Sequence, residues 1–261
     1  MFTISLFLAT MALASDPDTA RVVSVYDGDT LTLNTGDKVR LRWVNTPELR
    51  PMEPYGIEAR EAAIDLVLGK EVELIYGPTK RDGYGRLLAG IRVDGVDLSE
   101  SLIEQGLGHL FIIPPDDIDL TVLTTAQNHA RASTRGIWTT DRYSGELHIT
   151  SFHANAPGDD RMNVNGEYLR ICNVSSQPID ITGYSIKNLS GRKMELPAMI
   201  IPVGHTFELH SGIGVNQLDP AQQLEVYLGS TQPIWNNTRD RATLFDRYDQ
   251  AVDSREHEPQ G

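Results

Sequence analysis

The stretch RLRWVNTPE, residues 40–48, decides which fold this sequence encodes. It begins as a strand and ends in a Thr-Pro turn that leaves Glu48 at the mouth of the strand. Side chains alternate along a strand, which predicts that Arg40 and Arg42 share one face. Asn45 is the residue that needs an explanation, because a metal site at this turn is expected to use a carboxylate. A plain turn would need neither Arg40 nor Glu48.

The segments around this stretch predict a small closed barrel. Three strands joined by glycine-containing turns come first, then a helix, two more strands and two further helices. In the first helix, Ile57, Ala62, Ile64, Val67 and Leu68 recur at helical spacing. This order suits an OB-fold barrel with helices packed on it, an α+β plan within a mainly β protein. The segments are VVSVYDG, DTLTLNTG, KVRLRWVN, EPYGIEAREAAIDLVLG, EVELIYG, RLLAGIRVDG, VDLSESLIEQG and IDLTVLTTAQNHARASTRG.

The character of the chain changes near TTDRYSGE, residues 139–146. Beyond this point short alternating runs are separated by clusters of Gly, Pro, Asn and Asp, and no long helix is expected. That pattern is typical of a β-sandwich. The sequence therefore predicts two domains, a barrel over residues 20–140 and an immunoglobulin-like β-sandwich over residues 146–250.

The overall charge of the chain argues against one class of nucleic-acid-binding protein. With 23 basic and 36 acidic residues, the formal net charge is −13. This argues against a general nucleic-acid coat protein, because phosphate binding usually draws on a basic surface. It still allows an enzyme that meets one phosphate with a few placed arginines.

The N-terminus, MFTISLFLATMALAS, is apolar and ends in the small-x-small pattern Ala12-Leu13-Ala14. We interpret residues 1–14 as a signal peptide, too short to span a bilayer comfortably, and expect a secreted or cell-surface protein. A buried N-terminal strand or helix is the alternative. No other segment is expected to span a membrane. Cys172 is the single cysteine, so no internal disulfide can form.

Three motifs in the first domain could carry chemistry: YDGDT at 26–30, the opening stretch, and RDGYGR at 81–86. Each also has a plain interpretation. YDGDT can be a hairpin turn, Arg40 and Glu48 can be a surface ion pair, and RDGYGR can be a hairpin loop with an incidental arginine.

Together and in this order, the motifs resemble those of the staphylococcal nuclease (thermonuclease) family over roughly residues 20–140. QGL at 105–107 and Ile-Trp at 137–138 also match the family pattern. The resemblance implies an OB-fold nuclease with a calcium-dependent phosphodiesterase site. It also implies roles for individual residues: Asp29 and the carbonyl of Thr46 as metal ligands, Arg40 and Arg86 as phosphate-binding groups, Glu48 as general base, and Tyr84 as a contact to a terminal phosphate.

Asn45 departs from the family pattern, which has an aspartate there as a metal ligand. Asparagine still offers a carbonyl oxygen, and calcium accepts neutral oxygen ligands. The resemblance then implies a metal site weakened by about tenfold or more, because calcium affinity follows ligand charge. Base preference does not carry over, since HLFIIPPDD after the QGL motif holds one aromatic residue, Phe111.

The second domain resembles the lamin tail domain, in HANAPGDDRMNVNGEYLRICNVSSQPIDITGYSIKN at 153–188 and IWNNTRDRATLFD at 234–246. Such modules accompany secreted nucleases and hydrolases. What this one binds is not predicted by the sequence. Asp159, Asp160 and Glu167 could hold a cation or could form a solvated loop.

Three functions follow as hypotheses. The first is a secreted, calcium-dependent endonuclease that hydrolyses the phosphodiester bonds of DNA and RNA. The second is a catalytically silent barrel that binds nucleic acid or protein beside an adhesive sandwich. The third makes the sandwich a surface adhesion module with the barrel as a passenger. Arg40, Glu48 and Arg86 together favour the first, because silent relatives typically lose this set.

Overall fold

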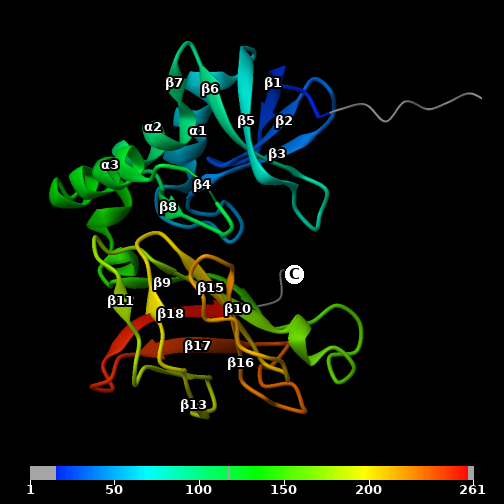
Figure 1. The fold of residues 1–261 in the computed structure, drawn as a ribbon, viewed down its shortest axis with the longest axis vertical. Helices are drawn as coiled ribbons and strands as arrows, with labels where there is room; N and C mark the ends of the chain where they lie inside the picture. Colours follow the sequence, from blue (N-terminus) through cyan, green and yellow to red (C-terminus); the bar gives the residue numbers. More distant parts are fainter. Residues whose placement is uncertain (1–15, 117, 258–261) are drawn as a thin grey trace, which may run out of the picture.

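A computed structural model describes residues 16–116 and 118–257, so the expected signal peptide lies outside the described residues. Two β-rich halves lie one above the other, joined through α3 and the segment after it (Figure 1). The first half is a closed five-stranded barrel with three helices and the second is a sandwich of two main sheets, as the sequence predicts. Among the described residues, no helix is long and apolar enough to cross a membrane.

The barrel is an antiparallel sheet in the order β3-β2-β1-β5-β6 that closes through parallel pairing of β3 with β6. The alternating strands turn one row of side chains inward, as Leu31, Leu33 and Val39 show. Gly36, with φ 89°, makes the tight turn between β2 and β3. The strands of this half are β1 (Thr19–Val25), β2 (Thr30–Leu33), β3 (Lys38–Leu41), β4 (Trp43–Asn45), β5 (Glu71–Arg81), β6 (Leu87–Val93), β7 (Val96–Asp97) and β8 (His109–Phe111).

The helices α1 (Gly56–Val67), α2 (Leu98–Glu104) and α3 (Thr121–Ala132) pack beside the barrel (Figure 1). The buried face of α1 carries Val67, as expected, together with the small residues Gly56, Ala59 and Ala63. The expectation that Ile57 and Leu68 face the core is wrong, since they are 46% and 44% exposed. The helix lies very close to the barrel, because a Cβ built on Gly28 would fall 2.9 Å from the Cβ of Ala59.

The strand of the opening stretch breaks at Arg42. β3 ends at Leu41, and β4 leaves the barrel to pair with β8. Trp43 has φ 69°, which turns the chain and ends the alternation. Up to Trp43 the burial still alternates, with Val39, Leu41 and Trp43 buried and the two arginines between them half-buried. The two guanidiniums have different partners, since Arg42 Nη2 lies 2.7 Å from Asp116 and Arg40 Nε lies 3.3 Å from Asp29.

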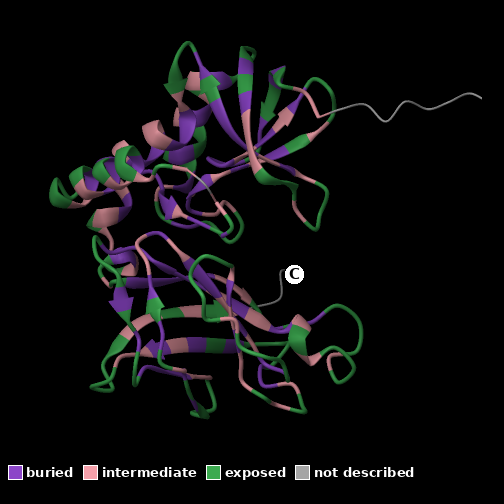
Figure 2. Cartoon of the chain, viewed as in Figure 1, coloured by how far each residue is buried: buried purple, intermediate pink, exposed green. Residues whose placement is uncertain are grey.

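The second half has two four-stranded sheets, β16-β15-β10-β9 and β13-β12-β17-β18, with the small pair β11-β14. Its own core includes Phe207 and Trp235, and Figure 2 shows separate buried interiors in the two halves. The strands are β9 (Leu147–His153), β10 (Tyr168–Asn173), β11 (Ile179–Asp180), β12 (Ser185–Lys187), β13 (Lys193–Glu195), β14 (Ile200–Ile201), β15 (Thr206–His210), β16 (Leu224–Tyr227), β17 (Asp240–Phe245) and β18 (Ala251–His257), with 3₁₀ turns η1 (Gly136–Thr139), η2 (Asp141–Tyr143) and η3 (Val164–Gly166).

Backbone hydrogen bonds join the two halves just after β8. Ile112 N–H donates to the carbonyl of Gly204 at 2.7 Å, and Thr206 N–H donates to the carbonyl of Ile112 at 3.1 Å. Beside them, buried Cys172 of β10 lies 3.9 Å from Nδ1 of buried His109 in β8. Backbone pairing and close packing therefore dock the sandwich directly against β8.

Candidate active site

Asp29 sits in the turn between β1 and β2 and is almost fully buried. Its Oδ2 accepts from the backbone N–H of Thr46 at 2.8 Å and from the Thr46 hydroxyl at 3.1 Å. Its Oδ1 accepts from the Thr30 hydroxyl at 3.2 Å. These bonds tie the YDGDT turn to the Thr-Pro turn, so two motifs far apart in the sequence form one rigid corner.

Arg40, near the end of β3, is held in place by the same corner. Its Nη1 donates to the carbonyls of Leu41 and Val44 at 2.8 and 2.9 Å, and its Nε lies 3.3 Å from Oδ1 of Asp29. The guanidinium carbon lies 5.6 Å from the centre of the Phe111 ring. A guanidinium fixed by this many partners is preorganised to meet an anion.

Glu48 is half-buried on the turn after β4 and lies in the same cavity as Arg40. Burial raises the pKa of its carboxyl, and the neighbouring charge of Asp29 raises it further, while Arg40 acts in the opposite direction. Its peptide is bound on both sides by Glu53: Glu48 N–H donates to Glu53 Oε2 at 3.0 Å, and Glu53 N–H donates to the Glu48 carbonyl at 2.8 Å. A raised pKa makes this carboxylate a stronger proton acceptor than an exposed glutamate.

Arg86 directly precedes β6, at the end of the glycine-rich hairpin. Asp82 of the same motif binds it twice, accepting from the backbone N–H at 2.9 Å and from Nε at 2.7 Å. This ion pair uses Nε and leaves the two Nη atoms outside it. Tyr84 lies at the hairpin tip, 79% exposed, with the Arg86 guanidinium carbon 5.7 Å from its ring centre.

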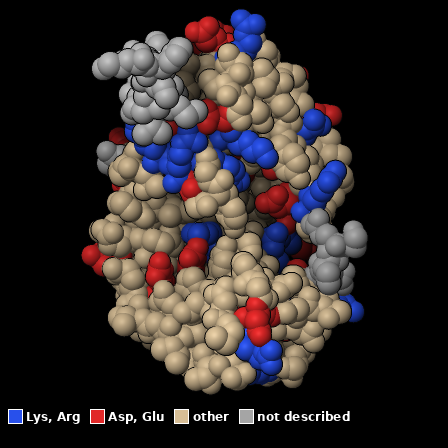
Figure 3. Space-filling model, turned by 90° about the vertical axis from the view of Figure 1, so that its right-hand side faces the viewer, with Lys and Arg blue, Asp and Glu red and all other residues tan. Residues whose placement is uncertain are grey.

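These groups line one cavity of about 380 Å³. Asp29, Arg40, Glu48 and Arg86 all contribute to its wall, which the sequence-based site predicts, while Tyr84 is not among the lining residues. Figure 3 shows basic side chains gathered over the barrel half of one face, with carboxylates beside and below them. The lining residues are Ser24, Tyr26, Asp27, Asp29, Thr30, Thr32, Lys38, Arg40, Glu48 and Arg86.

Asp27 and Lys38 line the cavity but received no role from the sequence. Asp27 is buried, and burial, followed by the charges of Asp29 and Glu48, raises its pKa to about 7. Its Oδ1 accepts from the backbone N–H of Asp29 at 3.1 Å. The available signal was its place two residues before Asp29 in one turn, which brings both carboxylates to the same strand end.

Asn45 lies beside this cluster and its side chain has two side-chain partners and one backbone partner. Its Oδ1 accepts from Nη2 of Arg40 at 2.9 Å, and its Nδ2 lies 3.5 Å from Nε2 of His109 and donates to the Thr46 carbonyl at 3.5 Å. His109 Nδ1 lies 2.9 Å from the carbonyl of Leu110, so Nδ1 carries the proton and Nε2 is an acceptor. An asparagine satisfies both neighbours, whereas an aspartate would place an oxygen against the Nε2 lone pair.

The oxygen-rich donor set suits a hard cation such as calcium. Asp27, Asp29 and the Thr46 carbonyl are the groups that would hold it, and Asn45 could join only by sharing the amide oxygen that Arg40 now binds. Burial is the main cause of the raised pKa of Asp27 and the charge of Asp29 adds to it, so a cation bound beside Asp27 would favour its ionised form. Within residues 16–116 and 118–257, no group of three or more His, Cys, Asp or Glu side chains is arranged to hold a metal on its own.

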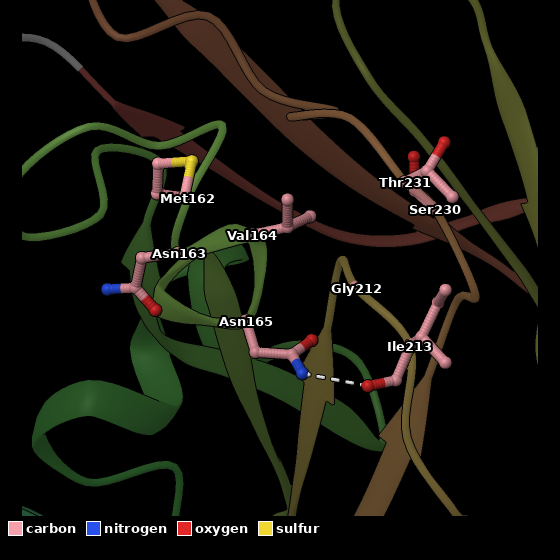
Figure 4. Close-up of a pocket in the computed structure, with 8 residues that line it drawn as sticks. All are labelled: Met162, Asn163, Val164, Asn165, Gly212, Ile213, Ser230 and Thr231. Atoms are coloured by element: carbon pink, nitrogen blue, oxygen red, sulfur yellow. Dashed lines mark hydrogen bonds between the residues drawn. The ribbon is translucent and has the colours of Figure 1, made fainter.

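The acidic loop of the second domain does not gather around a common point. Asp159 pairs with Arg161 at 2.8 Å, and buried Glu167 accepts from the backbone N–H of Ile234 at 2.9 Å. A second hollow, of about 370 Å³, lies next to this loop, where Asn165 Nδ2 donates to the Ile213 carbonyl at 2.9 Å (Figure 4). Its lining is neutral: Met162, Asn163, Val164, Asn165, Gly212, Ile213, Ser230 and Thr231.

A closed five-stranded barrel with an arginine- and carboxylate-lined cavity at its turns places the first half in the OB-fold class. The sequence model described as "Staphylococcal nuclease homologue" matches residues 38–140, and that of the "Lamin Tail Domain" matches residues 140–258. The chain belongs to the staphylococcal nuclease homologue family and carries a lamin tail domain after the nuclease-type domain.

Proteins of known sequence agree with this assignment. An "Uncharacterized endonuclease" of Escherichia coli O157:H7 is 35% identical over 120 residues, covering 45% of this chain and 75% of the relative. A "Thermonuclease" of Staphylococcus intermedius is 31% identical over 124 residues, covering 45% and 74%. "Endonuclease YncB" of Bacillus subtilis (strain 168) is 30% identical over 140 residues, covering 51% and 63%.

Proposed function

We propose that this protein is a secreted, calcium-dependent endonuclease that hydrolyses phosphodiester bonds of DNA and RNA. The observation that carries the proposal is the shared cavity of Arg40, Glu48 and Arg86 beside the buried carboxylate Asp29. Hydrolysis of a phosphodiester needs a base for water, positive charge for the phosphate oxygens, and a fixed geometry between them. These residues supply all three needs.

In the proposed reaction, Glu48 accepts the proton of a water molecule that attacks phosphorus in line with the leaving oxygen. Arg40 and Arg86 bind the equatorial phosphate oxygens, where negative charge accumulates. Calcium, when bound, neutralises phosphate charge and orients the reacting groups. Asp29 would hold the cation while its bonds to Thr46 keep the Thr-Pro turn, and with it Glu48, in register.

Export is proposed on the apolar N-terminal stretch and its small-x-small ending, residues 12–14. A weak calcium site suits an exported enzyme, because extracellular calcium sites work at about 10⁻⁴–10⁻³ M. Expression of the full gene with cell fractionation and N-terminal sequencing tests this. A mature chain that begins after Ala14 in the extracellular fraction supports export, and an intact N-terminus inside the cell contradicts it.

The activity is tested by incubating the purified protein with plasmid DNA and with RNA, in calcium or in a calcium chelator. Cleavage in calcium that stops with the chelator supports the proposal. Glu48→Gln is the matched control for contaminating nuclease, because it keeps the shape of the side chain. Binding of either nucleic acid without cleavage at millimolar calcium would favour the silent binding module instead.

A further inference from the structure

We propose that Arg255 of β18 is a positioning residue for the nuclease site: it holds Glu53, and Glu53 holds the turn that carries Glu48. The lamin tail domain would then complete the active site of the barrel. The effect of Arg255 on catalysis rests on the proposed nuclease function. Its effect on the position of the Glu48 turn rests on the structure alone.

Glu53 is the link between Glu48 and the second domain. Glu53 belongs to the loop between β4 and α1. This loop runs along the side of the barrel that faces the sandwich (Figure 1). Its two hydrogen bonds to the peptide of Glu48, at 3.0 and 2.8 Å, fix the backbone from which the glutamate side chain projects. A shift of Glu53 therefore moves Glu48 directly.

The carboxylate of Glu53 is itself held by two arginines. Its Oε1 lies 2.9 Å from Nη2 of Arg142, in η2, and 3.1 Å from Nη2 of Arg255. The other end of the Arg255 guanidinium is anchored, because its Nη1 donates to the Ile149 carbonyl at 3.1 Å. Oε1 of Glu53 thus contacts Arg255 of the second domain and Arg142 of the interdomain segment, while Oε2 accepts from the Glu48 N–H.

The ion pair between Arg255 and Glu53 is largely buried, which makes it energetically important. The side chains of Arg255 and Glu53 are 14% and 9% exposed. An exposed ion pair contributes little to stability, whereas a buried ion pair is costly to break. Loss of Arg255 would leave the Glu53 carboxylate with Arg142 and free to reorient toward it, away from the Glu48 N–H.

The contact is also separate from what docks the domains. The backbone bonds of Ile112 with Gly204 and Thr206 lie just after β8, and neither Arg255 nor Glu53 takes part in them. Arg255 meets the barrel at the loop that leads to the base. A change at Arg255 is therefore expected to disturb the catalytic turn more than the attachment of the second domain.

The test uses the full chain with Arg255→Gln, Arg255→Lys and the matched control Arg241→Gln. Arg241 lies on the adjacent strand β17 and is 47% exposed in a loose pair with Glu256 at 3.8 Å. Arg255→Gln is expected to lower kcat about tenfold or more with KM within about threefold, because small misplacement of a catalytic group is costly. Arg255→Lys, which keeps the charge, should recover part of kcat, and Arg241→Gln should match the parent.

Amide hydrogen exchange of the segment 46–53 is measured on the same proteins and needs no activity. Exchange at the Glu48 N–H should accelerate in Arg255→Gln and stay at the parent rate in Arg241→Gln. An unchanged exchange rate, or an active parent whose Arg255→Gln variant keeps kcat within twofold, overturns the inference. If the parent cleaves neither DNA nor RNA, the proposed function fails by itself, and the exchange result still decides whether Arg255 positions this turn.

Discussion

Acidification should destabilise the folded protein through His109, which lies buried where the barrel meets the sandwich. Burial lowers the pKa of its imidazole to about 3, and the neighbouring His148 adds to this effect. The groups facing the ring come from both halves: Asn45, Cys172, Tyr143 and His148. The ordinary pKa of an exposed histidine is about 6.5.

The two pKa values decide whether stability rises or falls with pH. Below about pH 6.5 the unfolded chain binds a proton at position 109 that the folded chain does not bind, so the free energy of unfolding falls as the pH falls. The contribution of neutral His109 is fully present above pH 6.5 and decreases by about 1.4 kcal/mol for each pH unit below it. At pH 4.5 the loss from this one group is therefore about 3 kcal/mol.

The assay is urea unfolding of the parent and of His109→Gln between pH 4.5 and 8, with a calcium chelator present. A glutamine can still donate to the Leu110 carbonyl and accept from Asn45, but it does not titrate. The difference in unfolding free energy between the two proteins should be constant above pH 7 and should shift by about 3 kcal/mol in favour of the variant at pH 4.5. A difference that is flat across the whole range would refute the assignment of a buried neutral histidine.

Three further predictions concern catalysis, and the melting temperature of each variant is measured on the same preparation as its activity. Glu48→Gln should lower turnover by about 10²–10⁴-fold with little change in calcium or substrate affinity; turnover within about threefold of the parent would end its assignment as the base. Arg40→Ala and Arg86→Ala should each lower the single-turnover rate by about 10²-fold or more. Arg42→Ala should lower the melting temperature and leave the single-turnover rate unchanged, because the buried ion pair of Arg42 with Asp116 lies outside the cavity. Asn45→Asp should reduce the calcium needed for half-maximal activity, and an unchanged or raised requirement would contradict its role as a ligand.

Local sequence determined the parts of the site that sit on turns. The motifs YDGDT, TPE and RDGYGR each specify a short piece of backbone through Gly, Pro and Asp. Their order along the strands predicts the barrel, and Asp29, Arg40, Glu48 and Arg86 meet in one cavity as that barrel requires. Turn chemistry acts within a few residues, which is why these features can be read from a single chain.

The ion-pair partner of Arg42 and the buried face of α1 depended on tertiary packing. Strand alternation predicts a common face for Arg40 and Arg42, but it does not predict that Arg42 pairs with Asp116 and lies outside the cavity that Arg40 lines. Hydrophobic spacing favours Ile57 over Ala59, yet the close approach to Gly28 leaves room only for the small side chain. Periodicity reports which residues prefer burial, and packing distance decides which of them fit.

The chain from Arg255 through Glu53 to Glu48 was decided by the tertiary structure alone. Two of these residues are five apart, and the third lies about two hundred residues away in another domain. Arginine and glutamate are common surface residues, so neither carries a sequence signal for this contact. Their pairing depends on how the sandwich docks against β8, and docking is set by the shapes of two finished surfaces. The sequence, through its resemblance to a family pattern, therefore predicted four residues of the cavity, Asp29, Arg40, Glu48 and Arg86, while the fold decided which other residues line it and which contacts hold the turn of Glu48 in place.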